Sequence, residues 1–268
     1  NNFNSYFFLI PVLLFLSPYF RSGSIWIDDN LFAIIFFSIS IYYFINFQFE
    51  DRSLKFVFLN TIFFALACYM RPIYCLFGFY FFLSYFNNLE KKSHLLYYII
   101  LNILLSLPAF YYVFILEINE WFQQHLFREN IITFFALSSS VLFFYFFPYI
   151  FYFIKENKIK KFTKFDFFIG FGYFISLLIF FDYSLPYSGG IFYRMFNLIT
   201  ESNILFYFFS MMSLMIFLKF ISSNKEMDKN INDILLFLIL VIFEFDGIIY
   251  HETYDPLFYL LIFLIFKN

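Results

Sequence analysis

Glycine, proline, cysteine and charged residues are all scarce in this chain. Its 268 residues include 7 Gly, 7 Pro and 2 Cys, and only 13% are Asp, Glu, Lys or Arg. The sequence has no Walker loop and no dinucleotide-binding fingerprint, since Gly170-Phe171-Gly172 is too short a match. Nucleotide-driven transport by this chain itself is therefore not expected. Two cysteines without zinc-type spacing also give no disulfide framework and no metal motif.

Apolar residues are abundant. Hydrophobic residues make up 63% of the chain, and aromatic residues alone make up 29%, with 53 Phe. This share is far above that of a soluble globular domain. The sequence therefore predicts an integral membrane protein.

Apolar runs between polar interruptions predict an all-α, polytopic bundle of about ten transmembrane spans, in one transmembrane domain over 1–268. Several runs are shorter than the roughly 20 residues that cross a bilayer, so we expect those helices to extend into flanking polar residues. The expected spans are 3–17, 31–47, 54–70, 73–86, 95–116, 131–154, 167–185, 204–221, 234–249 and 257–266. Because the chain starts at Asn1 without Met or a signal peptide, we expect it to lack the N-terminus of a longer protein.

Basic residues divide unevenly between alternate loops, which sets the expected orientation. Lys and Arg next to membrane spans accumulate on the cytoplasmic side. One set of loops holds Arg52, Lys55, Lys91, Lys92, Lys155, Lys158, Lys160, Lys161, Lys164, Lys219, Lys225, Lys229 and Lys267. The other set holds only Arg21, Arg71, Arg128 and Arg194. We therefore predict that the first set is cytoplasmic and the second extracytoplasmic.

The junction Met70-Arg71-Pro72 admits two interpretations. Residues 54–86 could form one helix kinked at the proline, or two helices joined by a tight hairpin. A single helix would place Lys155 to Lys164 outside, against the orientation rule, so we favour the hairpin. Cys68 and Cys75 flank this junction; the geometry allows a disulfide, but we expect both to be buried apolar residues.

The first outer loop carries Arg21, Asp28, Asp29 and Asn30. One interpretation is that the acids cap the next helix. The other is that Arg21 binds an anionic headgroup while an aspartate supports a base or an acceptor sugar. Arg71 likewise either reaches toward lipid headgroups or binds a phosphate.

Further candidates lie in later outer segments. Arg194 follows a flexible turn and precedes an amphipathic stretch, and 117–130 is expected to be a short helix on the outer surface, so short interfacial helices are predicted there. Asp182, near the outer end of its span, and Glu244 and Asp246, at greater depth, are candidates because buried charges are costly unless they serve a site. The polar segment before the last span adds His251 and Tyr254. A solvated connector explains those two residues equally well.

Short motifs resemble those of the GT-C superfamily of polytopic glycosyltransferases. The similarity covers roughly the first ninety residues and the last twenty. The motifs are Phe15-Leu16-Ser17-Pro18-Tyr19-Phe20-Arg21-Ser22-Gly23-Ser24-Ile25-Trp26, Asp29-Asn30-Leu31, Tyr69-Met70-Arg71-Pro72-Ile73-Tyr74 and Tyr254-Asp255-Pro256-Leu257.

The resemblance implies a polyprenyl- or dolichyl-phosphate sugar donor and an active site on the extracytoplasmic face. It implies catalytic acids at Asp28 and Asp29 and donor binding by Arg21 and Arg71. The family's acidic loop follows its first helix, which would precede Asn1 in a longer protein. That leaves open whether the catalytic acid lies upstream.

The residues themselves fit the same chemistry, because a lipid-linked donor requires an apolar groove, a cation for its phosphate and a carboxylate for the acceptor proton. We expect a membrane glycosyltransferase acting on a glycan or lipid acceptor, surrounded by membrane lipids. No nucleic-acid partner is expected. The expected location is a bacterial inner membrane. No cofactor is predicted, and the spaced carboxylates leave a divalent metal open without supporting one. The alternatives are a secondary transporter or lipid-linked glycan flippase, and an O-antigen polymerase or ligase.

Overall fold

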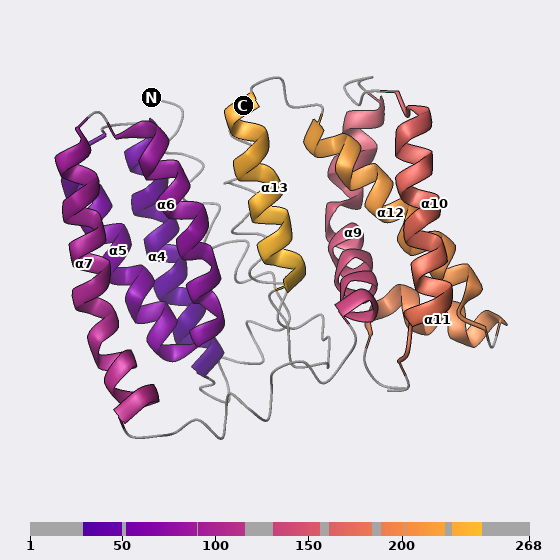
Figure 1. Cartoon of the computed structure of the whole chain (residues 1–268), viewed down its shortest axis with the longest axis horizontal. Helices are drawn as coiled ribbons and strands as arrows, with labels where there is room; N and C mark the ends of the chain where they lie inside the picture. Colours follow the sequence, from indigo (N-terminus) through magenta and orange to yellow (C-terminus); the bar gives the residue numbers. More distant parts are fainter. Residues whose placement is uncertain are drawn as a thin grey trace. The chain divides into compact units, whose positions relative to one another are not determined.

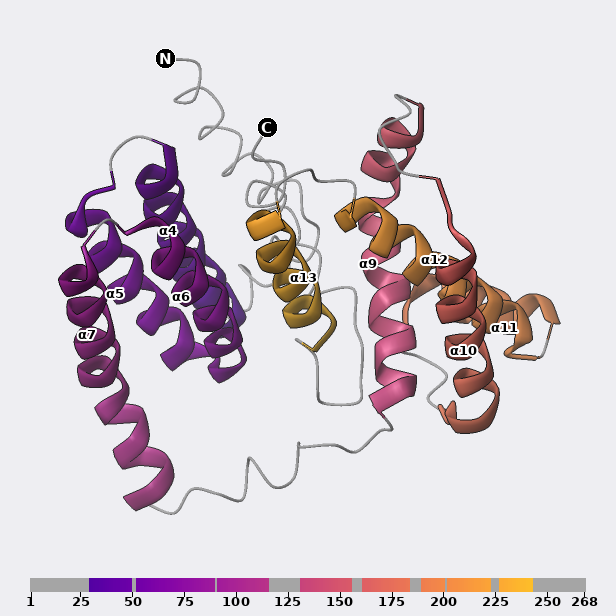
Figure 2. The same ribbon diagram turned by 45° about the horizontal axis from the view of Figure 1, so that its top comes forward.

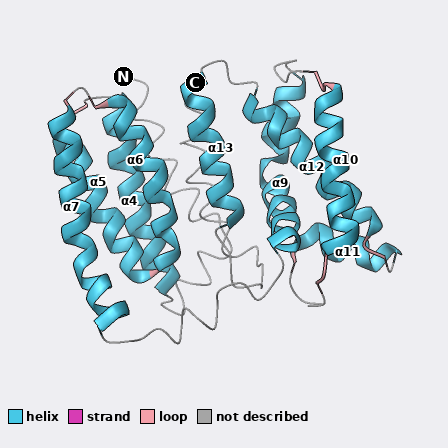
Figure 3. Ribbon diagram, viewed as in Figure 1, coloured by secondary structure: helices cyan, strands magenta, loops and turns pink. Residues whose placement is uncertain are grey.

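The computed structural model describes residues 29–49, 52–89, 91–115, 131–155, 161–183, 189–200, 202–222 and 227–242. Helices account for nearly all of these residues, and no strand occurs among them (Figure 3). The all-α prediction is therefore confirmed for the described part of the chain. The chain divides into two compact units, one of residues 1–123 with 255–268 and one of residues 124–254.

The described residues of the first unit form four α-helices and two short helical turns (Figure 1). Their bounds are α4 Asp29–Phe49, α5 Leu54–Met70, η1 Pro72–Leu76, α6 Phe77–Asn88, α7 Lys92–Phe110 and η2 Tyr111–Ile115. The bounds of α5 match the predicted span, and α4 extends its predicted span by two residues at each end. The expected span 95–116 is instead α7 followed by a π-helical turn, η2, three residues after Pro108. Proline in a helix removes a hydrogen bond and favours such an irregularity.

The chain reverses direction at Arg71. Pro72 restricts the preceding residue to extended conformations, and Arg71 has φ −139° and ψ 108°. On the far side of the turn, Tyr85 donates a hydrogen bond to Asn60 Oδ1 at 2.9 Å, and the rings of Phe64 and Phe81 lie 5.2 Å apart. From Asn60 to Phe64 the residue numbers rise in α5, whereas those of their partners in α6 fall from Tyr85 to Phe81. The two helices are therefore antiparallel. The predicted hairpin is confirmed, and the kinked single helix is excluded.

A small polar cluster lies inside the otherwise aromatic core of the first unit. The Asn60 amide donates to the Ser40 carbonyl at 2.9 Å and to the Ser40 hydroxyl at 2.7 Å, and both residues are buried. Buried polar groups are costly unless they are paired, so these bonds favour one register of α4 against α5. The rings of Phe37 and Phe44 pack around this cluster against η1 and α6.

Where the structure describes the second unit, it contains five α-helices (Figure 2). Their bounds are α9 Ile131–Lys155, α10 Lys164–Phe180, α11 Gly190–Thr200, α12 Ile204–Ser222 and α13 Met227–Ile242. The predicted start of the ninth span at 234 is wrong, because α13 begins seven residues earlier, at Met227. The Met-Asp-Lys-Asn segment at its start is polar, and polar residues are well tolerated in a first helical turn.

Two contacts fix the directions of the helices in the second unit. The Ser210 hydroxyl bonds to the Ala136 carbonyl and the Ser213 hydroxyl to the Ser139 carbonyl, so α12 runs parallel to α9. Tyr173 of α10 shares a hydrogen bond with Ser210, and α10 runs in the opposite direction. A Cβ at Gly170 would lie only 2.5 Å from Met215 Sδ, so this glycine permits the close approach of α10 and α12.

Two described helices are long and apolar enough to cross a bilayer: Leu31–Phe49 within α4, and α7. Shorter apolar helices cover Leu54–Met70, Ile131–Phe147 and Ile204–Lys219. The full set of ten spans is not confirmed and stays a prediction, and so does the single domain. The expected first and last spans, 3–17 and 257–266, lie outside the described residues.

Candidate functional site

The basic residues that the structure describes lie toward opposite ends within each unit. In the first unit Arg52 and Lys55 lie at the start of α5, and Lys91 and Lys92 lie at the start of α7. Because α4 and α5 run antiparallel, as do α5 and α6, these four residues share one end. Arg71 lies at the opposite end, between α5 and η1. We call the end of this unit that carries Arg71 its arginine end.

The start of α4 lies at the arginine end together with Arg71. Ser40 and Asn60 are hydrogen-bonded across the antiparallel pair α4 and α5. Asp29 precedes Ser40 by the same eleven residues by which Arg71 follows Asn60. Phe37 of α4 also packs against Tyr74 of η1, with centroids 4.8 Å apart. The helix start that bears Asp29 and the turn that bears Arg71 are therefore brought together by the fold.

Arg71 occupies a well-supported turn. Its backbone N–H donates to the Ala67 carbonyl at 2.9 Å, and its own carbonyl accepts from the Tyr74 N–H at 3.2 Å. Tyr74 is buried, whereas Arg71 itself is half-buried. The guanidinium forms no ion pair with any carboxylate in the part of the chain that the structure describes. Such a cation on a fixed backbone is suited to binding an anion.

The apolar surface of α7 lies beside this turn. The Tyr69 hydroxyl donates to the Leu105 carbonyl, which joins the last turn of α5 to α7. Tyr98 is the one buried residue of α7, and large apolar side chains on the rest of the helix are exposed. They include Leu96, Tyr97, Ile100, Ile103, Leu104, Leu107 and Phe110. An uncovered apolar face therefore extends along the unit to the arginine end.

The cysteines differ from expectation. Both were expected to be buried, but Cys68 is half-buried and Cys75 is exposed. The prediction of burial is wrong for Cys75 because η1 is a short turn at the end of the unit rather than part of the core.

Asp182 lies beyond the helix in which it was placed. The predicted span 167–185 includes this residue, but α10 ends at Phe180, and Asp182 is exposed. The assignment to an outer position within the span is corrected. The Asp182 backbone N–H donates to the buried Thr133 hydroxyl at 3.0 Å, which ties this connection to the start of α9.

Arg194 lies on the amphipathic helix α11. The Tyr193 hydroxyl donates to the Tyr183 carbonyl at 3.0 Å, and the two rings are 5.2 Å apart. The neighbours of Asp182 and Arg194 are thus in contact, although the two charged groups form no ion pair in the described structure. One face of α11 packs through Phe192 on Phe209, with centroids 4.2 Å apart. The predicted amphipathic helix is confirmed.

Several side chains of α11 are exposed. They include Arg194, Ile191, Met195, Leu198 and Ile199. The predicted turn before this helix contains Gly189 and Gly190, both at positive φ, and a Cβ at Gly189 would lie 2.7 Å from the Tyr193 ring. Glycine is therefore required where the chain enters the helix.

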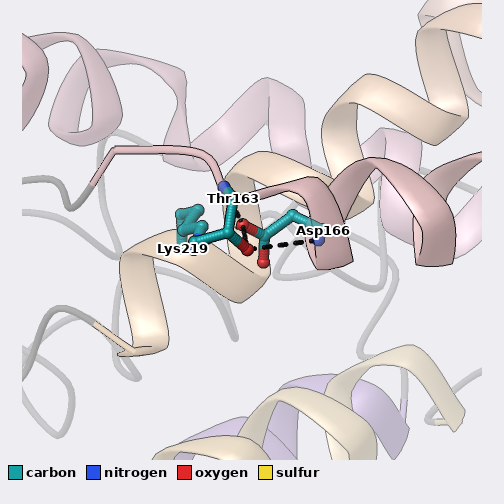
Figure 4. A network of polar contacts seen from close by, with 3 residues as sticks. All are labelled: Thr163, Asp166 and Lys219. Atoms are coloured by element: carbon teal, nitrogen blue, oxygen red, sulfur yellow. Dashed lines mark hydrogen bonds and ion pairs between the residues drawn. The ribbon is translucent and has the colours of Figure 1, made fainter.

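The opposite end of the second unit holds an ion pair that the sequence did not predict. Lys219 Nζ lies 2.6 Å from Asp166 Oδ2, and the side chains are 9% and 19% exposed (Figure 4). Thr163 and Asp166 also form a capping box at the start of α10. The lysine and the threonine hold the pKa of Asp166 well below its usual range, at about 2. The Thr-x-x-Asp spacing predicts the capping box. The sequence alone does not distinguish Lys219 from an ordinary loop lysine.

Several predicted site residues lie outside the described residues: Arg21, Asp28, Glu244, Asp246, His251 and Tyr254, as well as the outer segment 117–130. For Asp29 the helix position is described, but not the side chain. No cluster of three or more His, Cys, Asp or Glu occurs in the described ranges. The convergence of Arg21 and Arg71 therefore stays a prediction.

Comparisons of the chain with known protein families, with characterised proteins and with solved structures gave no match.

Proposed function

We propose that this chain belongs to a polytopic membrane glycosyltransferase. It moves a sugar from a polyprenyl-phosphate donor to a glycan or lipid acceptor on the extracytoplasmic face of a bacterial inner membrane. The observation that carries the proposal is the arginine end of the first unit. There, Arg71, the helix start that bears Asp29 and the apolar face of α7 come together.

The exposed face of α7 supports a membrane location. A helix of this length and apolar character in a soluble protein would be buried in a core, whereas α7 buries only Tyr98. Large apolar side chains in contact with water would be unfavourable by about 25 cal/mol per Å². Acyl chains cover such a face without this cost. The ten predicted spans form part of this proposal.

The distribution of basic residues supports the orientation. Lysines gather at one end of each unit, and Arg71 and Arg194 lie at the other. In the second unit Asp166 to Phe180 covers roughly 21 Å along α10 at 1.5 Å per residue, with Lys164 before this stretch and Asp182 after it. The ends that carry the lysines face the cytoplasm under the positive-inside rule. The ends that carry Arg71 and Arg194 then face outward.

Each part of the arginine end has a role in the proposed transfer. The polyprenyl tail lies along α7, and the Arg71 guanidinium binds the donor phosphate through its planar pair of donors. The Asp29 carboxylate accepts the proton from the acceptor hydroxyl as the new glycosidic bond forms. The phosphate leaves with the electrons of the broken sugar–phosphate bond, and Arg71 stabilises its charge.

Sugar transfer from a polyprenyl-phosphate donor, measured in membranes that contain the full-length protein, tests the proposal. Arg71→Lys is expected to raise the donor concentration at half-maximal rate about tenfold or more. Asp29→Asn is expected to lower the rate of transfer by a factor on the order of 10²–10⁴. Arg52→Lys is the matched control, because Arg52 is exposed at the opposite end of the same unit.

The transporter alternative gives a different result in the same membranes. A transporter would move the lipid-linked sugar across the bilayer without a new glycosidic bond. If Arg71→Lys and Asp29→Asn both transfer sugar as the unmodified protein does, the proposed site is wrong.

A further inference from the structure

Helix α11 lies at the end of the second unit where α10 ends and α12 begins. The ring centroid of Tyr193 is 6.0 Å from that of Phe181, the residue after α10, and 5.3 Å from that of Phe206, the third residue of α12. Figure 1 and Figure 2 both show α11 running across the direction of α9 and α10. In a bundle that spans a membrane, a crosswise amphipathic helix at the end of the bundle lies at the level of the lipid headgroups.

Aromatic contacts fix α11 to the unit. Phe192 and Phe196, which are four residues apart, both pack on Phe209 of α12, with ring centroids 4.2 Å and 5.5 Å away. Phe209 lies five residues after Ile204, the first residue of α12, or roughly 7.5 Å along the axis at 1.5 Å per residue. This depth matches the roughly 5–10 Å to which interfacial helices sink into the boundary between headgroups and acyl chains.

Other positions of α11 carry large apolar side chains that are exposed. Leu198 is 86% exposed, Ile199 66% and Met195 39%. Leu198 and Ile199 follow Met195 by three and four residues, so the three side chains lie on the same side of the helix. Water is an unfavourable environment for these side chains, whereas acyl chains cover them without that cost.

Arg194 is next to these apolar side chains. It precedes Leu198 by four residues, so the two side chains are neighbours on the helix surface. The Arg194 side chain is exposed, and it forms no ion pair with any carboxylate among the residues that the structure describes. The helix itself, Gly190–Thr200, contains no acidic residue. A guanidinium beside apolar side chains at headgroup level matches a lipid phosphate in charge and in hydrogen-bonding geometry.

We propose that α11 is an interfacial helix that docks the second unit on the membrane surface and binds an anionic phospholipid through Arg194. The exposed apolar side chains lie among the outer parts of the acyl chains, and the guanidinium donates hydrogen bonds to the lipid phosphate. An anionic headgroup is preferred over a zwitterionic one, because it has no positive group that competes for the phosphate. This inference rests on the membrane location in the proposed function and not on sugar transfer.

The test uses the full chain in lipid nanodiscs, with Cys68 and Cys75 replaced by serine and a fluorophore attached to one introduced cysteine. L198C reports on α11. F171C reports on the middle of α10, where Phe171 is 61% exposed. Lipids that carry a nitroxide either near the headgroup or deep in the acyl chain quench the fluorophore according to its depth. The shallow nitroxide is expected to quench more strongly at position 198, and the deep nitroxide at position 171.

The two positions separate the possible failures. Deep quenching at position 171 without lipid quenching at position 198 would overturn the interfacial helix and leave the membrane location intact. No quenching at either position would remove the membrane location, and with it the proposed function. Before labelling, a disulfide between the L198C residues of two chains would show that a second copy covers α11 in place of lipid, which would also overturn the proposal.

A second measurement tests the headgroup. Shallow nitroxides are placed on an anionic phosphatidylglycerol or on a zwitterionic phosphatidylcholine, and quenching at position 198 is compared. The anionic lipid is expected to reach the same quenching at a concentration about fivefold lower. This preference should disappear in Arg194→Gln and persist at least in part in Arg194→Lys, which keeps the charge. Lys164→Gln, which removes an exposed charge from α10, is the matched control and should leave the preference unchanged.

Three results would overturn the lipid site. The first is equal quenching by the two lipids in the unmodified chain. The second is an equal loss of preference in Lys164→Gln and Arg194→Gln, which would reflect the net charge of the unit. The third is loss of the preference when inorganic phosphate is added at constant ionic strength, which would indicate a site for a free anion.

Discussion

Lys219 Nζ of α12 lies 2.6 Å from Asp166 Oδ2 of α10, at the end of the second unit opposite to Arg194. The lysine is buried, and the acid also accepts hydrogen bonds from the Thr163 backbone and hydroxyl. One carboxylate therefore both caps α10 and holds α12 in register. Removing the acid leaves a buried cation without this partner, which is unfavourable.

The first prediction concerns this pair and pH. The folded pKa of Asp166 is lowered to about 2, below its value of about 4 in the unfolded chain. A lowered pKa contributes stability that is complete above about pH 4 and is lost as pH falls toward 2. Asp166→Asn is therefore expected to lower the melting temperature at pH 6, and the difference from the unmodified protein should disappear near pH 2. Lys164→Gln, which changes an exposed charge in the same helix, should not reproduce this pH dependence.

The second prediction concerns the buried Asn60 cluster. Asn60→Ala removes the hydrogen bonds to Ser40 and leaves the buried Tyr85 hydroxyl without its acceptor. The free energy of unfolding is expected to fall by about 1–3 kcal/mol. Asn102→Ala is the control, because Asn102 bonds only to the Tyr98 carbonyl of its own helix. Equal losses in the two variants, measured by denaturant titration in detergent, would contradict a role for the cluster in joining α4 to α5.

The third prediction separates two glycines of α10. A side chain at Gly170 would collide with Met215, whereas nothing lies within 4 Å of a Cβ at Gly172. Gly172→Ala is expected to stabilise the helix by up to about 1 kcal/mol through helix propensity. Gly170→Leu is expected to destabilise the unit by about 1–3 kcal/mol through overpacking. Thermal unfolding of both variants checks the sign of each effect, and the same sign in both would show that α10 does not approach α12 as described.

The fourth prediction concerns orientation in the membrane. In a chain with both native cysteines replaced by serine, Lys161→Cys and Arg194→Cys place single thiols at exposed positions on opposite ends of the second unit. An impermeant maleimide added to intact cells is expected to label position 194 and not position 161. Permeabilised cells provide the control, because both positions should then react. Labelling of position 161 alone in intact cells would reverse the topology.

Local signals in the sequence were enough for the positions of most helices. The bounds of α5, the reversal at Arg71-Pro72 and the amphipathic character of α11 follow from short-range effects: apolar runs, the restriction of a residue before proline, and the flexibility of Gly189-Gly190. Such effects act over a few residues and need no knowledge of partners. Arg71 could be proposed as a phosphate-binding residue from sequence because the same local signals place it in the turn between two apolar segments.

The faces that pack together were decided only by the tertiary structure. Helices α5 and α12 carry Phe, Leu and Ile on all sides, so their sequences do not indicate which face is buried. The burial of Lys219 beside Asp166 and the contact of Asn60 with Ser40 depend on residues at least 20 positions apart. By itself the sequence determined a helical, apolar chain, and the division of its basic residues between two sides of a membrane stays a prediction. The long-range pairing of polar groups inside that apolar surrounding was settled by the fold, because an unpaired polar group there is costly and each pair admits one register.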